Sequence, residues 1–339
     1  MSRRLLVAAA AAGALTLAAC GSPAASGGSS SGGGSSSMKM TIGYTAIGAA
    51  YDDLYVCEDK GIFQKYGVDA KLTLLNSSSQ LFAGLASNSV QVGAGVVEST
   101  AEGVLGSNID LRYVALPIPV YYLEMWGNKA ITSPDQIKGK KIGLSSPGSL
   151  GDTAVDAFLK DKGWTDKDVH KVYLKSTPSE VTALQQGAVD AIVTQPPTGT
   201  KTRSKGFVKI MDFTKYPAAA NAYTVKADYA KKNPTAIAAF VKAETECLSI
   251  LHNDPATAIA SIEKHSGTSD AALAKYAYDF FNPLWAKTPT VDVGLVGEAF
   301  SSAAKKVDKP APADVSKYVD NSYVDQLKSS GFLNTLYSK

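Results

Sequence analysis

Residues 39–44 (KMTIGY) and residues 140–144 (KKIGL) follow one pattern, in which a lysine leads into a short apolar strand, a loop of small residues and then a helix. A second pair of segments recurs in the same order. Residues 85–92 (LASNSVQV) and 184–191 (LQQGAVDA) each end an apolar helix at a turn and enter a strand. Because only two copies are present, the repetition indicates two similar α/β lobes and not a solenoid.

Strands and helices are predicted to alternate along the chain, which favours mostly parallel sheets covered by helices on both faces. In the first copy we predict strands at residues 40–44, 68–75, 90–94 and 111–116, and helices at 50–60, 80–86 and 100–105. After a strand at residues 208–211 we predict a return to the first lobe, through a strand at 221–225 and helices at 234–251, 255–264, 270–281 and 293–307.

The size of the chain agrees with two lobes. A folded part of about 300 residues with 45% hydrophobic content can bury a large core. We predict that lobe one comprises residues 38–126 and 213–339 and that lobe two comprises residues 127–212, so that the chain crosses between them twice.

The first residues predict export and attachment to a membrane. Arg3 and Arg4 precede an apolar run at residues 5–17, which is too short for a permanent membrane span and is typical of a signal peptide, here residues 1–19. The segment Leu17-Ala18-Ala19-Cys20 resembles a bacterial lipobox, in which Cys20 would carry acyl chains such as palmitate. The alternative is an ordinary cleavage site that contains a cysteine. Residues 20–37 are rich in Gly and Ser and predict a flexible tether.

Net charge excludes one class of partner. Removal of Arg3 and Arg4 with the signal peptide leaves 32 of the 34 basic residues against 31 acidic residues, a net charge of +1. This balance argues against nucleic-acid binding.

Cys57 and Cys247 remain once Cys20 is assigned to lipid. An exported location permits a disulfide, but sequence alone does not place the two residues together. We expect two buried thiols in preference to a bridge.

Motifs of catalysis and metal binding are missing from the sequence. His170, His252 and His265 have no second His or Cys at ligand spacing. No Gly-Lys-Ser/Thr follows residues 148–151 (GSLG), which excludes a P-loop, and residues 93–95 (GAG) lack the third glycine of a dinucleotide fingerprint. The sequence therefore predicts a binding protein, with no enzymatic activity, metal or cofactor.

Polar loops follow the predicted strands of both lobes, at the edge where ligands bind in open α/β sheets. Several of these loops lead into helix N-termini, whose free N–H groups can hold polar ligand atoms. The alternative for each loop is that its Ser or Asp only caps the following helix. The candidate ligand-binding residues are Tyr44, Ser77, Ser78, Ser79, Gln80, Glu98, Ser146, Gly148, Ser149, Gly151, Asp152, Thr153 and Gln195.

Several segments together resemble the family that contains the nitrate, sulfonate, taurine and thiamine-precursor binding proteins. They are residues 60–69 (KGIFQKYGVD), 133–143 (SPDQIKGKKIG), 147–149 (PGS), 184–191 and 233–240 (NPTAIAAF), and the resemblance extends over most of residues 38–281. It implies the two-crossover (type II) periplasmic-binding-protein fold, hinge closure on a small solute, and delivery to an ABC permease and ATPase. We expect a monomer. The alternatives are a ligand-sensing lipoprotein and an enzyme similar to pyrimidine synthases.

The charges of the loops depart from those of a simple anion binder. None of the candidate loops contains Lys or Arg, whereas Glu98 and Asp152 lie within them. Aromatic residues that could stack on a ring or face a cation are also available: Tyr44, Tyr51, Tyr55, Tyr121, Tyr122 and Trp126. We therefore expect a neutral or weakly cationic organic solute, and we expect Glu98→Gln to weaken binding of a cationic ligand.

Overall fold

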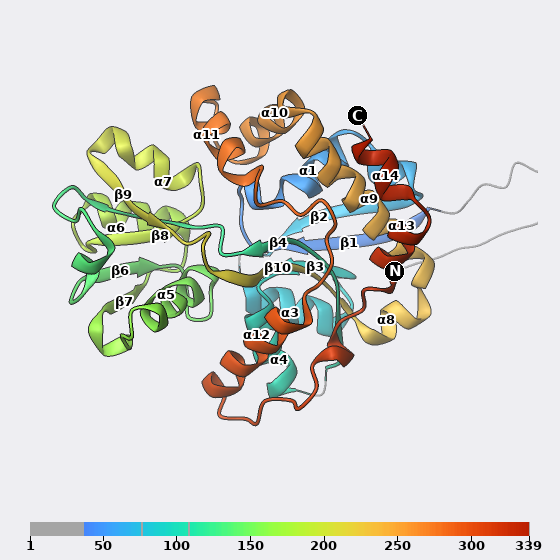
Figure 1. Cartoon of the computed structure of the whole chain (residues 1–339), viewed down its shortest axis with the longest axis horizontal. Helices are drawn as coiled ribbons and strands as arrows, with labels where there is room; N and C mark the ends of the chain where they lie inside the picture. Colours follow the sequence, from blue (N-terminus) through green and yellow to red (C-terminus); the bar gives the residue numbers. More distant parts are fainter. Residues whose placement is uncertain (1–36, 76, 108, 339) are drawn as a thin grey trace, which may run out of the picture. The chain divides into compact units, whose positions relative to one another are not determined.

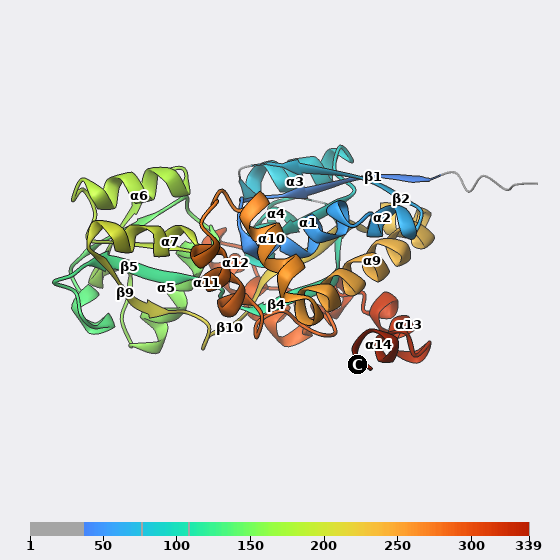
Figure 2. The same cartoon turned by 90° about the horizontal axis from the view of Figure 1, so that it is seen from above.

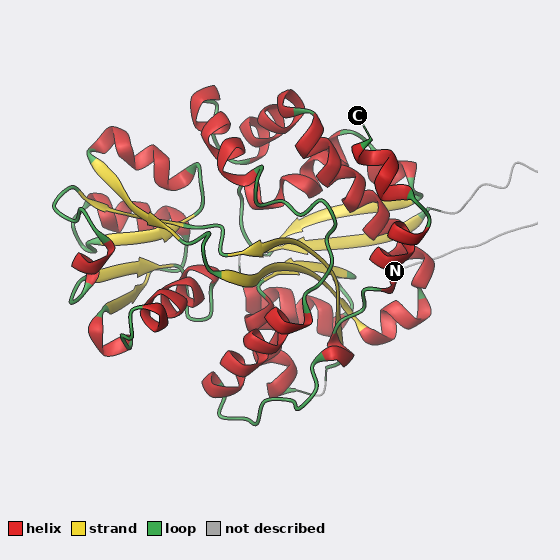
Figure 3. Cartoon of the chain, in the orientation of Figure 1, coloured by secondary structure: helices red, strands yellow, loops and turns green. Residues whose placement is uncertain are grey.

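The structure is a computed structural model that describes residues 37–75, 77–107 and 109–338. The predicted signal peptide, Cys20 and nearly all of the tether lie outside these residues. Two five-stranded sheets organise the described chain, and helices cover both of them (Figures 1 and 3). Among the described residues, no helix combines the length and the apolar character that a membrane span requires.

The first sheet has the strand order β2-β1-β3-β10-β4. Its strands are β1 (Met38–Tyr44), β2 (Val68–Leu74), β3 (Val92–Gly95), β4 (Leu111–Val120) and β10 (Pro217–Lys226). β1 pairs in parallel with β2 and β3, whereas β10 runs antiparallel to β3 and β4. The late strand predicted at residues 221–225 is thus the second half of β10, which is inserted between the early strands β3 and β4.

Helices pack on both faces of this sheet. One face carries α1 (Asp52–Asp59), α2 (Ile62–Lys65), α9 (Pro234–Asn253), α10 (Pro255–His265) and α11 (Ala271–Phe281), and the other carries α3 (Ser78–Ser87), α4 (Val97–Gly106) and α12 (Val293–Lys306) (Figure 1). Three further helices complete this part of the chain. α8 (Ala227–Lys232) follows β10, and α13 (Ser322–Ser329) and α14 (Phe332–Tyr337) come after α12. Figure 2 shows α13 and α14 beside α9. Neighbouring residues of β4 serve the two faces in turn: Val114 packs in the α1 and α9 core, and Tyr113 in the α3, α4 and α12 core.

The second sheet has the order β7-β6-β8-β5-β9. Its strands are β5 (Glu124–Asn128), β6 (Lys141–Leu144), β7 (His170–Tyr173), β8 (Ala191–Thr194) and β9 (Phe207–Asp212), and its helices are α5 (Leu150–Asp161), α6 (Thr177–Gln185) and α7 (Thr198–Lys201). β5 is the antiparallel strand, as β10 is in the first sheet. Because β5 begins at Glu124, the predicted boundary after Trp126 assigned three residues of this strand to the wrong sheet.

The two sheets are joined by two short linkers that lie side by side. One linker connects β4 to β5 through residues 121–123, and the other connects β9 to β10 through residues 213–216. The Tyr121 N–H donates to the Tyr216 carbonyl at 3.1 Å, and the Phe213 N–H donates to the Leu123 carbonyl at 2.9 Å. The linkers therefore form one hydrogen-bonded pair.

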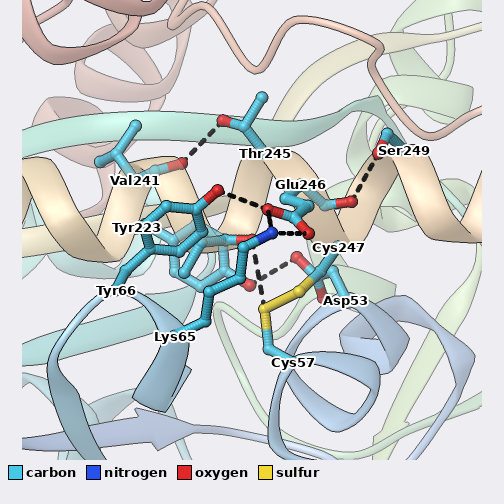
Figure 4. Close-up of a disulfide and its surroundings, with 11 residues drawn as sticks. Asp53, Cys57, Lys65, Tyr66, Tyr223, Val241, Thr245, Glu246, Cys247 and Ser249 are labelled. Atoms are coloured by element: carbon cyan, nitrogen blue, oxygen red, sulfur yellow. Dashed lines mark hydrogen bonds and ion pairs between the residues drawn. A yellow bond between two sulfur atoms is a disulfide. The ribbon is translucent and has the colours of Figure 1, made fainter. Parts of the chain in front are cut away.

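Cys57 and Cys247 form a disulfide, so the expectation of two free thiols was wrong (Figure 4). Cys57 lies on α1 and Cys247 on α9, and these helices pack against each other with a Cα–Cα distance of 5.6 Å at the two cysteines. That distance lies within the range that a bridge requires. Sequence could not reveal it, because the two cysteines are 190 residues apart.

Candidate functional site

A cavity of about 150 Å³ lies where the carboxyl ends of the strands of both sheets meet. Its lining residues follow β1, β2, β3, β6 and β7, lie at or just after the end of β8, or belong to the linker at residues 121–123. They are Thr45, Ala46, Tyr51, Ser77, Ser78, Val96, Tyr122, Leu123, Ser145, Ser146, Ser149, Leu150, Gly151, Lys175, Thr177, Glu180, Val193, Thr194 and Gln195. This is the position at which open α/β sheets bind ligands.

The size and lining of this cavity suit a small polar solute. A protein cavity of about 150 Å³ can hold a molecule as large as benzene. Hydroxyl side chains come from both lobes, and two of them, Ser77 and Ser149, also cap helices. Ser77 Oγ accepts from the Gln80 N–H at 3.2 Å, and Ser149 Oγ accepts from the Asp152 N–H at 3.4 Å. The capping alternative is therefore correct for these two residues, although both still line the cavity.

Direct contacts join the lobes beside the cavity. The side-chain oxygen of Gln195, on lobe two, accepts from the Ala50 N–H of lobe one at 3.3 Å. Ser99 Oγ of lobe one donates to the Gly148 carbonyl of lobe two at 2.5 Å. The described conformation thus has the two lobes in contact around the cavity.

Gly48 makes the approach of Gln195 possible, which leads to a testable prediction. A Cβ on residue 48 would lie 2.4 Å from the end of the Gln195 side chain. We expect Gly48→Ala to displace Gln195 and to weaken, by about tenfold, the affinity for any solute that stabilises the wild type, equivalent to about 1.4 kcal/mol. The unfolding temperature without solute should also fall by a few degrees, because Gly48 has a φ of +159°, a backbone conformation that L residues rarely adopt.

Isothermal titration and a thermal unfolding scan test this prediction. Gly139→Ala is the matched control, since Gly139 also has a positive φ, +74°, and an added Cβ there meets no atom within 4 Å. Equal affinities for the wild type and Gly48→Ala would show that the contact of Gln195 with lobe one does not contribute to solute binding.

Glu180 and Lys175 are the charged lining residues that the sequence analysis missed. Lys175 lies between β7 and α6, and Glu180 lies in the first turn of α6. Both were missed because no strand was predicted at residues 170–173, so no loop after it was considered. The Glu180 residue is 2% exposed, and its Oε2 atom has no hydrogen-bond partner. Burial raises the pKa of Glu180 to about 8. The internal repeat could have revealed this segment, because Ser176 caps α6 as Ser77 caps α3.

Glu98 and Asp152 do not line this cavity, and lysines neutralise both. Glu98 accepts from Ser302 Oγ at 2.8 Å and pairs with Lys306 at 2.8 Å. Asp152 accepts from the Gly148 N–H at 2.9 Å and pairs with Lys171 at 2.9 Å. The expectation that these carboxylates face a cationic ligand therefore loses its basis, and we now expect Glu98→Gln to leave solute affinity nearly unchanged.

The other candidates divide between this cavity and its surroundings. Of the predicted ligand-binding residues, the cavity is lined by Ser77, Ser78, Ser146, Ser149, Gly151 and Gln195, and it is not lined by Tyr44, Ser79, Gln80, Glu98, Gly148, Asp152 and Thr153. Glu98 and Thr153 line a neighbouring cavity of about 170 Å³ between α5 and α12, together with Tyr121. Of the aromatic candidates, Tyr51 and Tyr122 line the cavity of about 150 Å³. Tyr44 packs on Tyr51 and Tyr55, and Trp126 is fully buried.

Two of the three histidines have structural partners outside the cavity. His252 bonds with the Asn282 side chain at 3.1 Å and with the Trp285 carbonyl at 3.0 Å. His265 pairs with Asp59 at 3.0 Å and stacks on Tyr55. Within the described part of the chain, no three His, Cys, Asp or Glu side chains are grouped so as to hold a metal ion.

The family profile described as NMT1/THI5 like matches residues 51–258, which is more than half of the chain. The chain belongs to the NMT1/THI5-like family. The matched region contains both linkers, the disulfide and every residue of the cavity lining except Thr45 and Ala46. No curated protein matches the chain in sequence.

Solved structures show the fold of this NMT1/THI5-like chain. A protein of Bordetella bronchiseptica RB50 is similar with a TM-score of 0.73 and 21% identity, over 86% of this chain and 97% of that one. The periplasmic aliphatic sulphonate binding protein SsuA of Escherichia coli gives 0.65 and 18%, over 80% and 91%. The periplasmic nitrate-binding protein NrtA of Synechocystis PCC 6803 gives 0.65 and 14%, over 85% of each chain. The α/β fold is therefore the periplasmic-binding-protein fold, as predicted.

Proposed function

We propose that this protein is the extracytoplasmic solute-binding lipoprotein of an ABC importer, which captures a small organic solute between its lobes and delivers it to a permease and ATPase. The observation that carries the proposal is the cavity at the carboxyl ends of both sheets, lined by residues of both lobes. A solute held there contacts both lobes at once, so its binding free energy favours the closed state.

The linkers and the disulfide support this proposal. Two short linkers that lie side by side allow the lobes to rotate as bodies without disturbing either core. The Cys57–Cys247 bridge is typical of proteins that fold outside the reducing cytoplasm. Attachment through Cys20 would keep such a protein near its permease. The E. coli and Synechocystis proteins of similar fold are periplasmic binding proteins.

The cavity favours binding over catalysis. Its lining contains no histidine and no cysteine, and the two cysteines of the described chain are bonded to each other. The lining can hold a polar solute through hydroxyls, one amide and the side chains of Glu180 and Lys175. The buried Oε2 of Glu180 is bonded to no hydroxyl among the described residues, whereas a nucleophile–base pair requires such a bond.

A thermal-shift panel on residues 38–339 tests the function. Solutes present at about a hundred times their Kd should stabilise the protein by about 2.7 kcal/mol, which is a shift of several degrees. We expect at least one small organic solute to produce such a shift on protein that has been denatured and refolded to remove bound host molecules. The proposal would be contradicted if no sulfonate, nitrate, amine, amino acid or pyrimidine stabilised the refolded protein.

A further inference from the structure

Glu180 in lobe two occupies the position that corresponds to Leu81 in lobe one. The two lobes repeat one helix: Ser77 caps α3, Ser176 caps α6, and the fourth residue after the cap is Leu81 in α3 and Glu180 in α6. Leu81 is fully buried, and its side chain lies where a Cβ on Gly93 or Gly95 would stand. The carboxyl at the equivalent place in lobe two thus differs from the buried apolar side chain of lobe one, and a local inconsistency of this kind is expected at functional sites.

The protein supplies little compensation for this buried carboxyl. Glu180 is 2% exposed, its Oε2 is completely buried, and no described residue donates a hydrogen bond to that atom. Buried carboxyls without partners destabilise folded proteins. The same residue lines the interlobe cavity.

The geometry points to Glu180 as the group that recognises an N–H donor of the solute, so we propose that the cavity selects small nitrogen-bearing molecules with a primary amine, an amidine or an amino-substituted ring. This inference rests on the proposed function, because it assigns the ligand class of the same cavity. A solute N–H group would donate a hydrogen bond to Glu180 Oε2, which has no partner among the described residues. This bond would offset the free energy that burial of the carboxyl costs. An anion that carries no N–H or O–H group cannot donate to this oxygen, and it could only accept a hydrogen bond from the protonated form of the carboxyl.

The remaining lining suits the rest of such a molecule. Ser77 and Ser149 mark the N-termini of α3 and α5, two helices of 10 and 12 residues whose first N–H groups favour acceptor atoms. Lys175 is the other charged residue in the lining, and Tyr51 and Tyr122 are the other titratable ones. Burial raises the pKa values of both tyrosines, so neither ionises near neutral pH.

Matched pairs of probes test the inference: 4-aminopyrimidine against pyrimidine, benzamidine against benzoate, and 2-aminoethanesulfonate against ethanesulfonate. We expect the N–H member of at least one pair to stabilise refolded wild-type protein by several degrees and its partner to do so by less than one degree. We expect Glu180→Gln to reduce affinity for that probe at least tenfold. Glu58→Gln, which changes an exposed glutamate on α1, should retain wild-type affinity.

Two further measurements separate recognition from a structural role. Glu180→Leu, which restores the residue type of Leu81, should raise the unfolding temperature of the empty protein and abolish probe binding. Calorimetry near pH 7 in buffers of different ionisation enthalpy should detect release of up to one proton when a cationic probe binds, because the empty site keeps Glu180 largely protonated.

The outcomes distinguish this inference from the proposed function. Equal stabilisation by both members of every pair, or full binding by Glu180→Gln, would overturn the role of Glu180 and leave solute binding intact. A drop in stability of both Glu180 variants would also overturn it, because the carboxyl would then be structural. Refolded wild type that no probe stabilises would overturn the proposed function, and this inference with it.

Discussion

The Cys57→Ala/Cys247→Ala double variant should lose about 4 to 5 kcal/mol of unfolding free energy, the largest effect we expect from any change described here. The bridge closes a loop between residues that are 190 positions apart, and cross-links across long loops remove the most entropy from the unfolded chain. It also ties α1, next to the cavity mouth, to α9 in the core of lobe one.

Denaturant titration in oxidising buffer measures this loss. Wild type reduced in denaturant and then refolded under reducing conditions is the control, and it should match the double variant, because both lack the cross-link. Both cysteines are fully buried, so reducing agent added to folded wild type should act only slowly. A midpoint equal to that of the oxidised wild type would show that native strain cancels the entropic gain.

Lys171→Met should destabilise lobe two by about 3 kcal/mol, because it leaves the buried Asp152 carboxylate with only the more distant Lys306, at 3.9 Å, as a counter-ion. Lys171 pairs with Asp152 and Asp166 at 2.9 Å each and also contacts Asp156, while its own side chain is only 11% exposed. Burial lowers the pKa of Lys171, but hydrogen bonds and charges from Asp156 and Asp152 outweigh this and raise it overall. The lysine is therefore fully charged at neutral pH.

A double-mutant cycle with Asp152→Asn isolates this interaction. The double variant should be more stable than Lys171→Met alone, since the amide carries no charge that needs a partner. Lys167→Met, which alters a neighbouring lysine without such contacts, should change stability by less than about 0.5 kcal/mol. Additive losses in the cycle would contradict the coupling, and a large loss of solute affinity would return Asp152 to the binding site.

The fold could be predicted because its pattern is local. Each parallel strand and the helix that follows it form one short sequence unit, so the repeat of residues 39–44 at residues 140–144 was enough to indicate two similar sheets. β7 was missed for a related reason. His170–Tyr173 is an edge strand whose residues are all half-buried or exposed, and it therefore lacks the apolar run that marks a central strand.

The charges of the site could not be predicted, because they depend on distant partners. Glu98 meets Lys306 from α12, more than 200 residues later, and Asp152 meets Lys171 from the neighbouring strand. Counting the charges of the loops includes Glu98 and Asp152 but leaves out Lys306 and Lys171, because neither lysine lies in a loop. Conversely, Glu180 reads as an ordinary acid in the first turn of a helix until its burial and missing partner are known.

The hydrogen bonds between the linkers also constrain how the protein can move. Tyr121 with Tyr216, and Phe213 with Leu123, make the two linkers act as a single strip, and a strip of this kind permits rotation about one axis far more readily than twisting or sliding. The protein then has essentially one slow degree of freedom. A single pair of spin labels across the cavity mouth should therefore yield a two-peaked distance distribution, and added solute should change the heights of the peaks without moving them.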